Sequence, residues 1–187
     1  MMAAIEAEGR AHAALLAGDL ETARRSYAEA ADGYRRSWAL APPKSYGRLV
    51  GLLKAAVIGG DARAAADEVR EALRDDPDAD GSPVAAYVRA VAAVIAGDDD
   101  AVPALAAKMA TRGEAFERTA DALSALAAGD GDGEAYAAAL AAIESDFAGR
   151  DAHLTGVAIA DTAVMLELLA DERGIAVRPD SPLVPVA

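Results

Sequence analysis

The chain contains 187 residues, of which 52 are Ala, only 8 are Phe, Trp or Tyr, and none is Cys. This composition favours helix over strand, and the lack of Cys excludes a disulfide framework, a thiolate metal site and a cysteine nucleophile. The net charge of −13 would repel phosphate backbones, which argues against nucleic acid as a partner.

Neither a secretory signal nor a membrane span is expected. The first ten residues carry Glu6 and Glu8 and lack a basic flank followed by an apolar run. Every Ala-rich stretch is interrupted by Asp, Glu, Arg or Gly, well short of the roughly 18 apolar residues that a spanning helix needs. The sequence therefore predicts a cytoplasmic chain without a membrane partner.

Four Gly-Asp pairs divide the chain at regular intervals. Each pair follows a run of small apolar residues; the pairs are Gly18-Asp19, Gly60-Asp61, Gly97-Asp98 and Gly129-Asp130. Gly ends a helix readily in the left-handed conformation, and Asp can cap the helix that follows. Successive pairs lie 42, 37 and 32 residues apart, a spacing typical of helical-repeat proteins. The pairs therefore predict the tight turns of helical hairpins.

A single all-α domain over residues 1–187 accounts for this pattern. The segments expected to be helical are 2–17, 19–40, 43–59, 61–75, 82–96, 99–110, 112–128, 133–148 and 154–173. Pro42 and Pro43 would then lie in the first turn of the third helix, where proline is tolerated. Three prolines between 175 and 187 exclude a helix there, so this tail should be extended and should dock on the last helices.

Residues at fixed distances from two of the Gly-Asp turns carry a family resemblance. After Gly60, the chain has Asp61, Ala65, Val69, Ala72 and Pro77; after Gly18, it has Asp19, Ala23, Tyr27 and Ala30. This spacing resembles the second helix of a tetratricopeptide repeat, best over residues 1–77 and in degenerate form over 82–148. The resemblance implies a right-handed superhelical array of antiparallel hairpins that acts as a non-catalytic protein–protein interaction module.

The resemblance also implies where a partner would bind. In that family the first helix of each pair lines a concave groove that receives a protein or peptide. The corresponding positions in this chain are Glu8, His12, Val50, Lys54, Tyr87 and Val91. The apolar members of this set are equally compatible with plain core packing, so an open groove and a closed core are both left open by the sequence.

The C-terminal segment 154–187 suggests a second function. It contains Ile159-Ala160-Asp161-Thr162, Leu168-Leu169-Ala170 and Ser181-Pro182-Leu183. These stretches are similar to the closing segment of all-α bacterial proteins that serve as immunity partners of secreted toxins. The alternative function is therefore an immunity protein that binds and neutralises a toxin, with its acidic surface matching a basic target.

No cofactor, metal or enzyme activity is predicted. The loop 76–81 matches the first half of an EF-hand, but Tyr87 occupies the place of the bidentate carboxylate that calcium requires. His12 and His153 are the only two His and lack the ligand number of a metal site. Neither a serine nucleophile motif nor a phosphate-binding loop is present.

Asp161 is the one carboxylate expected inside an apolar helix face. On a helix it shares an arc with Val157, Val164, Met165 and Leu168. A buried carboxylate must find hydrogen-bond donors or raise its pKa. We therefore expect Asp161 to hold the extended tail or to cap a neighbouring helix.

Overall fold

The computed structural model describes residues 1–128 and 132–185, and all regular structure in them is helical. The elements are α1 (Met2–Leu16), α2 (Leu20–Ala39), α3 (Gly47–Gly59), α4 (Ala62–Ala72), α5 (Pro83–Ala96), the 3-10 helix η1 (Asp99–Ala101), α6 (Val102–Ala110), α7 (Glu114–Ala127), α8 (Gly133–Ala148) and α9 (Asp161–Glu172). Within these residues the predicted all-α class and the nine α-helices are confirmed. None of the described helices is both long and apolar enough to cross a bilayer.

Three of the four predicted Gly-Asp turns end helices as expected. Gly18, Gly60 and Gly97 have φ values of 74°, 91° and 74°, in the left-handed region that favours glycine. The side chain of Asp19 then caps α2 by accepting a hydrogen bond from the backbone three residues further on, at 3.0 Å. The fourth pair, Gly129-Asp130, lies outside the described residues.

Two of the predicted helix starts are wrong. The third helix begins at Gly47 rather than at 43, because Lys44 after the two prolines has φ 66°, a conformation that no right-handed helix contains. The last helix begins at Asp161 rather than at 154. Gly156 has φ 74°, and the N–H of Ala160 donates to the carbonyl of Leu183 at 2.8 Å instead of to a helical partner.

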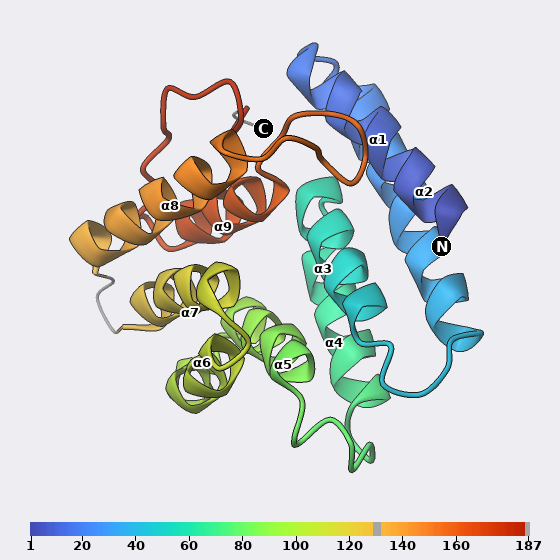
Figure 1. Cartoon of the computed structure of the whole chain (residues 1–187), viewed down its shortest axis with the longest axis vertical. Coiled ribbons are helices and arrows are strands. Elements are labelled where there is room, and N and C mark those ends of the chain that lie inside the picture. The colour runs from blue at the N-terminus through green and yellow to red at the C-terminus, as the bar shows by residue number, and fades with distance from the viewer. Residues whose placement is uncertain (129–131, 186–187) are drawn as a thin grey trace.

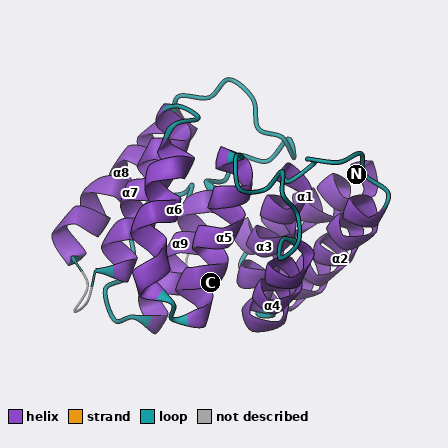
Figure 2. Ribbon diagram, turned by 90° about the horizontal axis from the view of Figure 1, so that it is seen from below, coloured by secondary structure: helices purple, strands orange, loops and turns teal. Residues whose placement is uncertain are grey.

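Consecutive helices pack against each other from α1 to α8, as Figure 1 shows. The odd-numbered helices α3, α5 and α7 also contact one another in series, and α9 packs on α3, α7 and α8. The view in Figure 2 shows the same helices from below, with a long loop passing over them. Helix α9 therefore lies against two members of this series, α3 and α7.

Small residues let the first helices approach closely. A Cβ at Gly33 of α2 would lie 2.8 Å from the Cβ of Ala4 on α1, and one at Gly51 of α3 would lie 2.5 Å from the ring of Tyr34. Both distances are below van der Waals contact, so these positions require glycine. Gly33 thus lets α1 and α2 approach closely, and Gly51 makes room for the Tyr34 ring between α2 and α3.

Arg173 fixes the C-terminal end of α9. Its guanidinium donates to both carboxylate oxygens of Asp99 at 2.7 and 3.0 Å. It also donates to the carbonyls of Leu126 at 2.8 Å and Val94 at 2.9 Å. A planar guanidinium suits such a multidentate arrangement, and it ties α9 to η1, α7 and α5.

The tail docks on α9, as predicted. Val184 is only 3% exposed, and the backbone N–H groups of Val177 and Arg178 donate to the Glu167 carboxylate at 3.2 and 2.6 Å. The extended segment is therefore held both by apolar burial and by hydrogen bonds to a side chain of the last helix.

Val184→Ala should lower the free energy of unfolding by about 1.5 kcal/mol, because it removes two buried methyl groups worth about 0.8 kcal/mol each. Val177→Ala is the matched control, since Val177 is 42% exposed and its truncation should stay within about 0.5 kcal/mol of the parent. Urea unfolding of the three proteins measures both values. Equal stability of all three would show that the tail does not contribute to the fold.

Candidate functional site

Four of the six predicted partner-binding residues line one cavity of about 240 Å³: Glu8, His12, Lys54 and Tyr87. The other two, Val50 and Val91, belong to an adjacent apolar layer that also touches Lys54 and Tyr87. Val91 is fully buried, whereas Val50 is partly buried against the core. Four of the predicted residues therefore line a partly enclosed cavity, and the other two lie in the apolar layer beside it.

The cavity draws its lining from six helices and from the segment between α8 and α9. Its charged and hydroxyl-bearing members include Glu8, His12, Lys54, Tyr87, Arg118, Thr119, Asp146, Arg150, Thr155, Asp161 and Thr162. The segment after α8 crosses to α1, where the carbonyl of Thr155 lies so close to Gly9 that a Cβ there would be 3.2 Å away. This crossing segment closes one side of the cavity.

The ion pair between Lys54 on α3 and Asp161 on α9 lies at the inner end of the cavity. The two side chains are 19% and 13% exposed, and the ammonium donates to Oδ2 of Asp161. Burial lowers the pKa of Lys54, but the charge of Asp161, the Tyr87 and Glu8 side chains and the hydrogen bond to Asp161 together outweigh burial, so the net pKa is raised. Burial raises the pKa of Asp161, yet the charge and hydrogen bond of Lys54, with smaller contributions from His12 and the Thr162 backbone, together hold it below its ordinary value. Both groups are therefore charged at neutral pH.

This pairing corrects the expectation for Asp161. The carboxylate is buried, as predicted, but its partner is Lys54 from a distant helix rather than the tail or a neighbouring helix end. The tail instead takes its side-chain hydrogen bonds from Glu167. Lys54 is predicted as a groove residue, but its ammonium pairs with Asp161 inside the protein.

Glu8 lies beside this pair without a cation of its own. It is 3% exposed, and its Oε2 accepts a hydrogen bond from the hydroxyl of Tyr34 at 2.8 Å. Burial raises the pKa of Glu8, and the charge of Asp161 raises it further, against the lowering effects of Lys54 and Tyr34. Unlike Lys54 and Asp161, Glu8 therefore has a neutral hydroxyl rather than an opposite charge as its hydrogen-bond partner.

His12 follows Glu8 by one helical turn and is 2% exposed. Its Nδ1 lies 3.0 Å from Oγ1 of Thr155, while its Nε2 has no hydrogen-bond partner among the described residues. Burial lowers the pKa of His12 to about 4, so the ring is neutral at pH 7. An unpartnered imidazole nitrogen therefore lines the cavity.

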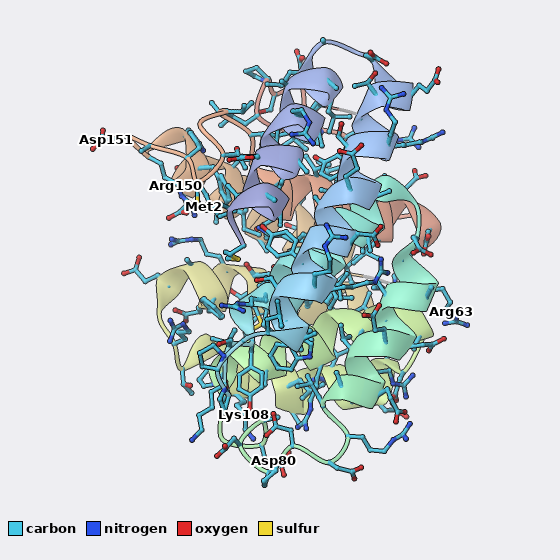
Figure 3. The ribbon with its side chains drawn as sticks, turned by 90° about the vertical axis from the view of Figure 1, so that its right-hand side faces the viewer. Met2, Arg63, Asp80, Lys108, Arg150 and Asp151 are labelled. Carbon is cyan, nitrogen blue, oxygen red and sulfur yellow. The ribbon has the colours of Figure 1, made fainter. Side chains whose placement is uncertain are left out.

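The opposite end of the cavity is basic. Arg118 on α7 and Arg150 after α8 both bond the Asp146 carboxylate, at 2.7 and 2.5 Å. The Arg150 guanidinium also lies 3.6 Å from the centroid of the Phe147 ring. Figure 3 shows Arg150 at the surface, next to Asp151 where the segment leaves α8. Two guanidiniums thus share one partly buried carboxylate, since the Asp146 side chain is 26% exposed.

Three buried polar atoms of the lining residues lack a hydrogen-bond partner in the described part of the chain. They are His12 Nε2, Tyr87 Oη and Arg118 Nε. Buried polar groups are nearly always bonded to protein or water, and about 240 Å³ far exceeds the roughly 10–15 Å³ that one water needs. The cavity is thus suited to a polar occupant.

Glu8, His12 and Asp161 are the residues that could hold a metal, since one potential ligand atom from each lies within 4.8 Å of the others. The Lys54 ammonium already bonds Asp161, however, and a divalent ion placed there would meet a fixed positive charge. In the acidic loop, Asp80 pairs with Arg89 at 2.7 Å, and its carbonyl accepts from Lys108 (Figure 3). Both places therefore have a protein cation where a metal would bind.

Comparison of the chain with protein-family models, curated proteins and solved structures found no match. The basic end of the cavity was not predicted from the sequence, because Arg118, Asp146 and Arg150 form no recognisable motif and meet only in the folded chain.

Lys54→Met should destabilise the protein by about 3 kcal/mol, since it leaves the Asp161 charge buried and unpaired. Adding Asp161→Asn should restore part of that loss by removing the stranded charge. Arg10→Met is the control, because the Arg10–Glu29 pair is 56% and 54% exposed and exposed pairs contribute about 0–1 kcal/mol. Equal effects of Lys54→Met and Arg10→Met in urea unfolding would contradict a structural role for the buried pair.

The neutral state of His12 predicts a pH dependence of stability. Between its ordinary pKa of 6.5 and its folded value of about 4, the unfolded chain binds a proton that the folded chain excludes. The stabilisation is thus complete above pH 6.5 and is lost as the pH falls towards 4. Between pH 7 and 4.5 the parent should lose about 2–3 kcal/mol more than His12→Gln. Parallel losses in the two proteins would show that His12 titrates normally.

Proposed function

We propose that this chain is a non-catalytic binding module that recognises a protein or peptide partner at the mouth of the cavity. The supporting observation is that the cavity opens beside a large exposed apolar side chain. Leu154 lines the cavity and is 75% exposed, and Arg150, which also lines it, is held against the Phe147 ring. Arg and aromatic side chains are enriched in protein–protein interfaces, and an arginine already held against a ring loses less freedom when a partner binds.

The proposal includes a tetratricopeptide-like, right-handed superhelical array as the scaffold. In its support, consecutive helices pack pairwise, and the first helices of successive hairpins, α3, α5 and α7, contact one another. Helix α9 packs against two of these helices, α3 and α7, so we place the partner over the remaining opening rather than along the whole groove. A cytoplasmic location is part of the same proposal.

A binding role fits the polar groups better than catalysis does. Lys54 is held as an ammonium by Asp161, which removes it as a nucleophile or base. Thr155 and His12 are 3.0 Å apart, but the second ring nitrogen of His12 has no acid to orient it. A working hydroxyl–imidazole pair relies on such a third group.

An immunity protein that neutralises a toxin is the alternative candidate. It is favoured by the net charge of −13, because 25 of the 31 acidic residues lie between 61 and 187. Such a surface would attract a basic toxin, and their affinity would fall steeply with salt. A partner bound mainly through Leu154 would be much less sensitive to salt.

Leu154→Ser should weaken partner binding at least about fivefold, the effect of losing about 1 kcal/mol from an apolar anchor. Leu40→Ser is the matched control, since Leu40 is 86% exposed but is not a lining residue of the cavity. The partner is first identified by native co-purification, and its affinity for each purified variant is then measured by calorimetry. Unchanged affinity in Leu154→Ser, or an equal loss in both variants, would place the interface elsewhere.

A further inference from the structure

The two ends of the cavity carry opposite unbalanced charges. At the inner end, Glu8 and Asp161 face one cation, Lys54, whose ammonium bonds Asp161. The hydrogen-bond partner of Glu8 is the neutral hydroxyl of Tyr34. With His12 neutral, one negative charge at this end has no counter-ion when Glu8 is ionised.

The basic end has the opposite imbalance. Arg118 and Arg150 share the single carboxylate of Asp146, which Arg118 reaches through Nη2 and Arg150 through Nε and Nη2. Arg118 also approaches Glu114 at 3.4 Å, but that carboxylate is 85% exposed and its charge is screened by water. Two guanidinium charges therefore share one partly buried carboxylate, and Arg118, at 26% exposed, is less accessible to water than Arg150, at 39%.

Each end also presents a buried polar atom without a partner. These atoms are His12 Nε2 at the acidic end and Arg118 Nε at the basic end. Phe116, Ile143 and Phe147 also line the cavity and offer apolar surface to the body of a ligand. The volume of about 240 Å³ is below the roughly 300–1,000 Å³ of pockets for drug-sized molecules, so a small ligand fits best.

We propose that the cavity binds a small zwitterion of the amino-acid type, with its ammonium at Glu8 and its carboxylate at Arg118 and Arg150. An ammonium would supply the missing counter-ion of Glu8 and can donate to the unpartnered nitrogen of His12. A carboxylate would accept from Arg118 Nε–H and balance the second guanidinium. The ligand site goes beyond the proposed function, and it shares Arg150 with the rim to which we assign the partner.

A zwitterion explains more of the cavity than a single ion does. A metal at Glu8, His12 and Asp161 would be repelled by Lys54 and would leave Arg118 and Arg150 unbalanced. A simple anion at the arginines would leave Glu8 and His12 as they are. Only a ligand with both charges satisfies both ends.

Calorimetric titration of the full chain tests the proposal with amino acids of increasing charge separation: glycine, β-alanine, γ-aminobutyrate, their longer homologues, and leucine. At least one should bind, and its N-acetyl and its carboxamide derivatives should each bind at least about tenfold more weakly, because a buried charge is left unpaired. Absence of binding by every member, or equal binding of the derivatives, would overturn the proposal. Tighter binding of zinc ion than of any zwitterion would also overturn it.

Two variants test which end of the cavity binds the ammonium of the ligand and which binds its carboxylate. Glu8→Gln keeps the shape and the Tyr34 hydrogen bond, and it should abolish the difference between the zwitterion and its N-acetyl derivative. Arg150→Gln should abolish the difference between the zwitterion and its carboxamide. Glu144→Gln is the control, since the buried Oε1 of Glu144 also lacks a partner although Glu144 is not a lining residue; it should bind like the parent. Persistence of both differences in the first two variants would refute the assignment.

The result of the zwitterion titration can be distinguished from the result of the partner-binding experiment. Zwitterion binding is measured on the isolated chain, whereas the Leu154→Ser test reads the affinity for a second macromolecule. Zwitterion binding with no effect of Leu154→Ser would uphold the ligand site and move the interface. The reverse result would uphold the interface and refute the ligand site.

Discussion

The buried pair between Lys54 and Asp161 determines how the end of the chain closes the fold. The two residues lie 107 positions apart in sequence, and neither charge is tolerable inside the protein without the other. Their pairing brings the start of α9 to α3, while Arg173 fixes the other end of α9 to α5, η1 and α7. Charges at both ends of one helix thus position it across the hairpins.

The cavity follows from that placement. With α9 held against α3, the segment before it must cross to α1, where Thr155 meets Gly9 and His12. The crossing encloses Glu8, whose charge is left without a cation, and brings the arginines of α7 and the segment after α8 to the same space. Burial makes each unbalanced charge costly, and that cost is what a ligand or partner of complementary charge can relieve.

Local signals in the sequence predicted the helices, whereas the site depended on long-range contacts. The turns at Gly18, Gly60 and Gly97 were predictable because the left-handed conformation of glycine is a local property. Of the Asp residues expected to cap the next helix, Asp19 does so with its side chain, whereas Asp61 and Asp98 do not. The start of α9 was not predictable, because the N–H of Ala160 bonds a carbonyl 23 residues later, at Leu183. The resemblance grouped Glu8, His12, Lys54 and Tyr87, which the structure brings together at one cavity. The partner of Asp161 and the arginines of the basic end had no local signal.

Native-state hydrogen exchange of α9 tests most directly whether this helix is integral to the fold. If the buried pair and Arg173 fix it, the central amides of α9 should exchange with the same free energy as those of α3, through global unfolding. Raising the denaturant concentration should then lower both protections with the same slope. Exchange of α9 at much lower free energy, while α3 and α5 stay protected, would show that α9 opens by itself. That result would contradict a closed cavity at its N-terminus.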